Sequence, residues 1–269
     1  MQKKAIGVFD SGLGGLTAVR EMLQILPGED IIYFGDTGRV PYGSKSNDTI
    51  SRYALQDARF LKSMGVKLIV AACGTVSSVA PDLSEQLGLP YTGVVYPTCF
   101  SAIQATRSGR IGVIGTAATI QSHSYKNRIG KKHPEITVIE QACPLFVPLV
   151  ENGMTDPDDE IVRLIVSRYL KVMKDNRVDT IILGCTHYPL LSEAIAREMG
   201  KDVTLIDSGK ETALYTKKLL EQHGLLSDSR NGAQRYYVSD TPADFEKFAG
   251  IFLQQKLSQK VEQISIEEY

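Results

Sequence analysis

The feature that most constrains the fold is a regular alternation of short β-branched runs with longer segments of helical periodicity. Apolar runs of four to six residues bounded by turn residues are typical of buried strands, whereas apolar residues spaced three or four apart mark one face of a helix. When strands alternate with helices along a chain, the strands pair in parallel and the helices cover the sheet. The sequence therefore predicts an α/β fold.

We expect strands at Ala5–Phe9, Ile31–Phe34, Lys67–Ala71, Thr92–Tyr96, Arg110–Ile114, Ile136–Glu140, Thr180–Leu183, Val203–Ile206 and Gln234–Val238. The clearest helical patterns are Leu16–Leu26, Asp48–Met64, Asp158–Lys174, Leu190–Met199 and Ala243–Leu257. Gly65 follows the second of these as a helix-ending residue, and Pro189 suits the first turn of the fourth. A helix is also expected after Cys73, with Pro81 interrupting it.

A faint internal repeat divides the chain. The run from Ile6 resembles the run from Ile111, and the run from Leu68 resembles the run from Thr180. Each half opens with a strand and a turn and later carries a cysteine at the end of a strand. We therefore predict a first domain of residues 1–97 plus 209–269 and a second of residues 98–208.

Composition narrows the functional classes. The chain has 269 residues with 30 Lys plus Arg and 31 Asp plus Glu, a formal net charge of −1. This balance favours neither nucleic acid nor an anionic membrane as a partner. We expect no signal peptide, no membrane span and no metal, because apolar runs are short and the four cysteines lack zinc-type spacing. Free thiols in the cytoplasm are the default for such a chain.

Candidate site residues lie where strands end, which is where open α/β sheets bind ligands. Asp10-Ser11-Gly12-Leu13-Gly14-Gly15 follows the first strand and precedes a helix whose free N–H groups suit an anion. It lacks the dinucleotide and phosphate-loop patterns, and by itself it reads as a tight turn. The segments Gly35-Asp36-Thr37 and Pro41-Tyr42-Gly43 form a turn-rich loop after the second strand.

Two cysteines occupy matching places in the two halves. Cys73 and Cys185 each lie between a strand and the start of a helix, where the helix dipole favours the thiolate. His187 lies two residues beyond Cys185 and is placed to raise its thiolate population or carry a proton. The remaining cysteines, Cys99 and Cys143, read as packing residues.

Two facing thiols suit the inversion of a carbon centre without a cofactor. One group must take a proton from one face while another delivers a proton to the opposite face, and the two exchange roles in the reverse direction. The carboxylate of an amino acid must be held by N–H donors as negative charge develops at its α-carbon. Helix N-termini and glycine-rich turns supply such donors.

At these residues the sequence resembles the glutamate racemases of the aspartate/glutamate racemase superfamily. The matching motifs run in order along the chain: Asp10-Ser11-Gly12-x-Gly14-Gly15, Gly35-Asp36-Thr37, Pro41-Tyr42-Gly43, Cys73-x-Thr75, Ile111 to Thr116, Ala142-Cys143-Pro144-Leu145, Glu151-x-Gly153 and Leu183 to Pro189. The resemblance implies two pseudosymmetric parallel-sheet α/β domains with the active site between them, a homodimer, and no cofactor. It also implies a cytoplasmic enzyme that supplies D-glutamate for peptidoglycan.

The resemblance also implies residue roles. Cys73 would take the proton from D-glutamate with help from Asp10, and Cys185 would take it from L-glutamate with help from His187. Glu151 belongs to the same catalytic surround. The implied substrate-binding residues are Asp10, Ser11, Tyr42, Gly43, Gly74, Thr75, Thr116, Thr186 and His187.

One position departs from the family pattern. The family usually has Asn after the first cysteine, whereas this chain has Gly74, so a side-chain amide is lost while the backbone N–H remains. Two alternatives therefore stay open: a racemase of another substrate, of the aspartate or hydantoin type, and a non-catalytic amino-acid-binding relative. The four residues Asp10, Cys73, Cys185 and His187 argue against the second, because binding alone needs no pair of thiols.

Overall fold

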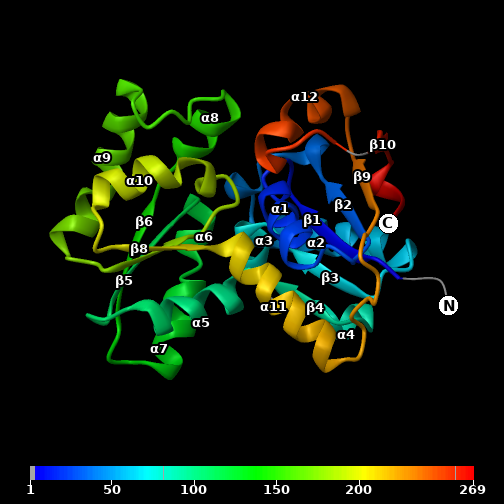
Figure 1. Cartoon of the computed structure of the whole chain (residues 1–269), viewed down its shortest axis with the longest axis horizontal. Coiled ribbons are helices and arrows are strands. Elements are labelled where there is room, and N and C mark those ends of the chain that lie inside the picture. Colours follow the sequence, from blue (N-terminus) through cyan, green and yellow to red (C-terminus); the bar gives the residue numbers. More distant parts are fainter. Residues whose placement is uncertain (1–3, 81, 258) are drawn as a thin grey trace.

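The computed structural model describes residues 4–80, 82–257 and 259–269 and contains two parallel sheets, which lie side by side in Figure 1. The six-stranded sheet has the order β10-β9-β2-β1-β3-β4 and the four-stranded sheet the order β6-β5-β7-β8. Every strand pair is parallel. The predicted α/β class with two parallel sheets is confirmed.

The strands of the larger sheet are β1 (Ile6–Asp10), β2 (Ile31–Gly35), β3 (Leu68–Ala71), β4 (Tyr91–Gly93), β9 (Gln234–Val238) and β10 (Val261–Gln263). Those of the smaller sheet are β5 (Arg110–Gly115), β6 (Thr137–Ala142), β7 (Thr180–Leu183) and β8 (Thr204–Asp207). The central strands β1, β2, β3 and β7 are buried along their whole length, which is why they read as uninterrupted apolar runs.

The α-helices are α1 (Leu16–Ile25), α2 (Asn47–Ser63), α3 (Gly74–Val79), α4 (Ser84–Leu87), α5 (Val95–Ala105), α6 (Ala117–Gln121), α7 (Ser124–Lys132), α8 (Phe146–Glu151), α9 (Glu160–Asp175), α10 (Ser192–Met199), α11 (Ser208–Gln222) and α12 (Pro242–Leu253). Short 3-10 turns are η1 (Thr37–Arg39), η2 (Tyr42–Ser44), η3 (Tyr188–Leu191) and η4 (Ile266–Glu268). Gly65 has a φ of 74° just beyond α2, as its predicted helix-ending role requires. Pro81, expected to interrupt the helix after Cys73, lies outside the described residues.

One predicted strand is partly wrong. The run Thr92–Tyr96 was expected to be extended, but β4 ends at Gly93 and α5 begins at Val95. Pro97 stands in the first turn of α5, where a missing backbone N–H costs no helical hydrogen bond. The apolar residues before Pro97 therefore start a helix instead of lengthening the strand.

Helix α11 joins the two sheets. It starts directly after β8, packs chiefly against α1 and also against α5, and crosses between the two halves in Figure 1. One apolar cluster is continuous across both halves and includes Val8 and Val70 of the larger sheet and Leu183 of the smaller. The domain boundaries at residues 97/98 and 208/209 stay a prediction.

None of the helices within the described residues is both long and apolar enough to span a bilayer.

Candidate active site

Cys73 follows β3 and immediately precedes α3. Its thiol donates to the hydroxyl of Ser11, with 3.6 Å between Sγ and Oγ. Asp10 ends the neighbouring strand β1, and its Oδ2 accepts from the backbone N–H of Gly12 at 2.9 Å. The parallel pairing of β1 with β3 thus brings together a thiol, a carboxylate and a hydroxyl from two strand ends.

The environment of Cys73 opposes the negative charge that we expected on its sulfur from the sequence. Burial and, to a lesser extent, the Asp10 carboxylate raise the pKa of the Cys73 thiol to about 12, against hydrogen bonds from Val76 and Ser11 that lower it. The expectation that the helix start favours the thiolate is therefore wrong for Cys73 in net effect. Because the thiol is only 5% exposed, desolvation outweighs the few N–H groups at the start of the six-residue α3.

Asp10 shares this buried setting. Burial raises the pKa of its carboxyl, while the charge on His187 and hydrogen bonds from Gly12, Gly15 and Cys73 lower it. Its second oxygen, Oδ1, is buried without a hydrogen-bond partner among the described residues. An unsatisfied buried carboxylate oxygen is a ready acceptor for a proton or for a ligand donor.

Cys185 follows β7 with His187 close by. The Sγ atom lies 3.9 Å from Nδ1 of His187, and Nε2 of the same ring lies 3.1 Å from Oε1 of Glu151. Burial alone lowers the pKa of His187, but hydrogen bonds to Cys185 and Glu151 and the charges of Cys185 and Asp10 raise it to about 10. The imidazole is thus held between a sulfur and a carboxylate and keeps its proton at neutral pH.

The two halves meet closely at these strand ends. A Cβ atom at Gly74 would overlap the carbonyl oxygen of Gly184 and lie 3.7 Å from the Cα of Cys185. The hydroxyls of Thr75 and Thr116 are 3.1 Å apart across the same boundary. The hydroxyl of Thr17, from α1, donates to the carbonyl of Thr186 at 2.9 Å.

The loop of residues 36–44, which follows β2 of the larger sheet, contacts the other half of the molecule at Thr116. A Cβ atom at Gly43 would lie 3.4 Å from the Cβ of Thr116. The hydroxyl of Tyr42 is hydrogen-bonded to Asp36 and, at 3.0 Å, to Asp57, so the side chain faces the protein interior. Any contact of Tyr42 with substrate in this conformation falls to its main chain.

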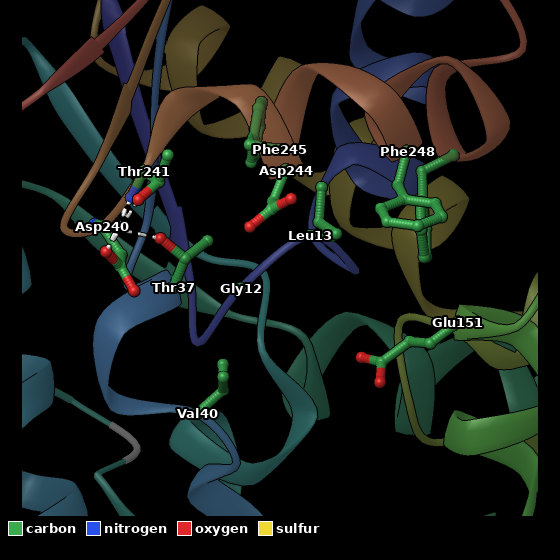
Figure 2. Close-up of a pocket in the computed structure, with 11 residues that line it drawn as sticks. Gly12, Leu13, Thr37, Val40, Glu151, Asp240, Thr241, Asp244, Phe245 and Phe248 are labelled. Carbon is green, nitrogen blue, oxygen red and sulfur yellow. Dashed lines mark hydrogen bonds between the residues drawn. The ribbon is translucent and has the colours of Figure 1, made fainter.

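A cavity of about 270 Å³ opens beside this cluster. Figure 2 shows Glu151 on one side and Phe248 of α12 on another, with Asp240 and Asp244 further along the wall. Its lining residues are Gly12, Leu13, Thr37, Val40, Glu151, Asp240, Thr241, Asp244, Phe245, Phe248 and Phe252. Cys73 and Cys185, at 5% and 7% exposure, are not among its lining residues.

The structure thus brings Asp10, Ser11, Cys73, Gly74 and Thr75 of one half against Thr116, Cys185, Thr186, His187 and Glu151 of the other, with Tyr42 and Gly43 at the edge. Cys99 and Cys143 are also buried, their thiols donate to the carbonyl oxygens of Tyr125 and Gln141, and burial raises the pKa of both. Among the described residues, no three His, Cys, Asp or Glu side chains are grouped to hold a metal ion.

The sequence analysis missed one neighbour of the site. Phe252 of α12 packs against the ring of His187, with 5.2 Å between ring centroids and an interplanar angle of 84°. The two residues are far apart in the chain, and Phe252 belongs to an ordinary apolar helix face. No local pattern signals such a contact.

Comparisons with known proteins agree with this geometry. The model of the family described as Asp/Glu/Hydantoin racemase matches residues 6–216. A glutamate racemase of Geobacter metallireducens is 48% identical over 269 residues, covering 99% of this chain and 98% of the relative. A glutamate racemase of Neisseria meningitidis serogroup A is 43% identical over 268 residues, covering 98% of each.

Solved structures match over the same extent. A glutamate racemase isoform from Bacillus anthracis, 37% identical, superposes with a TM-score of 0.93 over 98% of each chain. The glutamate racemase of Francisella tularensis, solved in complex with D-glutamate and 40% identical, superposes with a TM-score of 0.92 over 100% of each chain. This chain therefore belongs to the Asp/Glu/hydantoin racemase family, among the glutamate racemases.

Proposed function

We propose that this chain interconverts L-glutamate and D-glutamate by proton transfer between two thiols. The observation that carries the proposal is the meeting of two strand ends from different sheets, one bearing Cys73 and the other Cys185, with Gly74 packed against Gly184. Full-length relatives at 43% to 48% identity are glutamate racemases, which favours glutamate over aspartate or hydantoin substrates.

In the L-to-D direction, Cys185 removes the α-proton and Cys73 supplies a proton to the opposite face. The raised pKa of Cys73 suits it to start this half-cycle as a thiol, and Nδ1 of His187, 3.9 Å from Sγ of Cys185, is placed to exchange a proton with that sulfur. After transfer, Cys185 carries the substrate's proton and Cys73 is a thiolate. The D-to-L direction begins from that state, which the free enzyme reaches when Asp10 accepts the proton of the Cys73 thiol and His187 gives its proton to Cys185.

The negative charge that develops on the substrate carboxylate needs donors. We assign this role to the hydroxyl and N–H groups that surround the two thiols, from Ser11, Gly74, Thr75, Thr116 and Thr186, with Gly43 at the edge. Both thiols are buried and neither lines the 270 Å³ cavity, so the strand ends must separate to admit glutamate between them. Asp10 and His187 then lie within reach of the substrate's polar groups.

The decisive experiment follows α-proton exchange. Purified protein is incubated with L-glutamate in heavy water without added cofactor, and optical rotation and α-deuterium are measured. We expect racemisation with deuterium incorporation, and a loss of at least about 10²-fold for Cys73→Ala and for Cys185→Ala, as for removal of a positioned acid or base.

The control is Cys99→Ala, which removes a buried thiol whose Sγ lies 3.9 Å from the carbonyl oxygen of Tyr125. This variant should retain the wild-type rate if it folds. Racemisation at the wild-type rate by either Cys73→Ala or Cys185→Ala would refute the two-thiol assignment. Binding of glutamate without exchange by the wild type would favour a non-catalytic relative, and exchange of L-aspartate alone would change the substrate.

Two further proposals rest on the resemblance. We propose that the chain forms a homodimer and acts in the cytoplasm, where D-glutamate is used for peptidoglycan precursors. Sedimentation at several protein concentrations and fractionation of cells test these two statements.

A further inference from the structure

The imidazole of His187 is held on several sides by groups from both halves of the molecule. In its own plane, Nδ1 faces Sγ of Cys185 at 3.9 Å and Nε2 faces Oε1 of Glu151 at 3.1 Å. The larger-sheet half closes on it at Gly14, where a Cβ would lie 2.7 Å from the ring. Phe252 packs on the ring at 5.2 Å in a near-perpendicular arrangement.

Phe252 reaches His187 from a distant part of the fold. It lies near the end of α12, which follows β9 of the larger sheet and packs against α1. His187 follows β7 of the smaller sheet. Phe252 is 1% exposed, so its ring is fixed by its surroundings and supplies a rigid wall to the imidazole.

We propose that Phe252 is a positioning residue that holds the His187 ring in the one orientation that faces Cys185 and Glu151 together. The proposal rests on the proposed function for its kinetic consequence, but its structural statement concerns the ring alone. Phe252 touches neither thiol in the contacts described, and it acts through His187.

The geometry explains why the ring needs such a wall. Two in-plane partners fix the imidazole only while both nitrogens point at them, and a rotation about its side-chain bonds breaks both contacts at once. Glu151 is half-exposed and lines the same cavity as Phe252, so it restrains the ring weakly by itself. Removing the Phe252 ring would join the space around His187 to that cavity and let the imidazole turn towards water.

The charged and titratable groups that face His187 are Glu151 from α8, Cys185 after β7 and Asp10 from β1. A ring that turns away loses its hydrogen bonds to Cys185 and Glu151, which are the main causes that raise its pKa. Loss of the wall should therefore lower the His187 pKa as well as slow proton transfer.

The test compares Phe252→Leu with Phe248→Leu. Phe248 belongs to the same helix and lines the same cavity, and no contact between its ring and His187 is found among the described residues, so it controls for general loosening of α12. We expect kcat to fall about tenfold in Phe252→Leu, a part of the 10²- to 10⁴-fold that a positioned acid or base supplies. KM should stay within about twofold, because a residue that does not touch substrate alters the transition state alone.

Both directions should slow equally in kcat/KM, because the enantiomers have equal free energy and share their transition states. Phe248→Leu should keep both constants. Phe252→Tyr, which retains a ring, should restore most of the rate and covers the case in which Phe252→Leu does not fold. A Phe252→Leu enzyme with wild-type kcat, or a Phe252→Tyr enzyme as slow as Phe252→Leu, would overturn the proposal.

The second readout does not require activity. In imidazole-labelled protein, the His187 resonance is assigned with His187→Gln and titrated by NMR. We expect its midpoint to fall in Phe252→Leu from the wild-type value towards about 6.5, the value of a free imidazole. An unchanged His187 titration midpoint in Phe252→Leu contradicts the positioning role, whatever substrate the wild type acts on. If the midpoint shifts but the wild type does not racemise glutamate, only the proposed function is refuted.

Discussion

Cys73 and His187 both follow a strand at the junction of the two halves, yet burial raises the pKa of the first and lowers that of the second. For Cys73 desolvation dominates and raises the pKa, so the thiol is protonated at neutral pH. For His187 the sulfur of Cys185 and the carboxylate of Glu151 outweigh desolvation, and the pKa rises to about 10. Both groups therefore hold a proton at neutral pH, Cys73 because of burial and His187 because of its neighbours.

The raised pKa of His187 predicts a pH dependence of folding stability. The folded state holds the His187 proton more tightly than the unfolded chain, so the stabilisation is complete below about pH 6.5 and is lost as pH rises towards the folded-state value of about 10. Between these values the free energy of unfolding should fall by about 1.4 kcal/mol per pH unit more in the wild type than in His187→Gln.

Urea denaturation of both proteins from about pH 6 to about pH 9 measures this difference. The subtraction removes the contributions of other titrating groups. Parallel curves for the two proteins over this range would show that His187 does not hold its proton as described.

At the scale of single residues, the sequence predicted part of the candidate site. It identified Cys73 and Cys185 because they follow strands in a repeated pattern and His187 because it lies beside Cys185, whereas the role of Asp10 came from the family resemblance. It could not identify Phe252 or the direction of the Cys73 pKa, because both depend on which distant side chains bury the group. The assignment of roles within the candidate set remains a proposal.

The loop of residues 36–44 is held by a buried charge network. The guanidinium of Arg39 is 2.6 Å from Oδ2 of Asp36 and 3.0 Å from Oδ1 of Asp57, and both carboxylates are fully buried. Tyr42 donates to the same two carboxylates, and Ser239 donates to Asp36. The network ties the loop to α2 and to the segment after β9, and so fixes Gly43 beside Thr116.

Arg39→Gln should therefore be costly. Removing one partner leaves two buried carboxylates without their cation, and we expect the free energy of unfolding to fall by about 3–5 kcal/mol. Arg197→Gln breaks two solvent-exposed ion pairs, with Glu193 and Asp158, and should have a much smaller effect. Chemical denaturation measures both, and equal small losses would show that the loop does not depend on this network.

The sequence predicted the bounds of some helices and strands more accurately than those of others, for physical reasons. Gln234–Val238 was predicted residue for residue, because turn residues bound its β-rich run. Strand β10 was missed, since two of its three residues are exposed and polar and only pairing with β9 makes it a strand. Helix α12 ends at Leu253 and not at Leu257, because Gln254 adopts a left-handed conformation.

At the scale of the whole molecule, each half contributes one thiol to a single junction. This arrangement follows from parallel strands, whose carboxyl ends gather at one edge of each sheet. Helix α11 and the apolar cluster shared by both halves hold the two edges against each other. Sequence alone indicated the repeat, but the facing of the two edges required the packing of α11 on α1.

The shared junction predicts joint protection of the two thiols. We expect iodoacetamide to modify Cys73 and Cys185, which the opening of the junction exposes, before Cys99 and Cys143, which are 2% and 0% exposed. D-glutamate at about ten times its Kd should slow both modifications about tenfold, by mass action on one occupied site. Peptide mapping by mass spectrometry measures all four rates, and protection of only one of Cys73 and Cys185 would show that they do not share a site.

At Gly74 the only atom offered to the opposite half is a hydrogen, and Gly184 fills the room that any larger group would take. A junction packed this closely excludes glutamate as well as bulk water. A substrate that reacts between the two thiols therefore requires the junction to open and close in each turnover, and the rate of that motion contributes to kcat beside the rate of proton transfer.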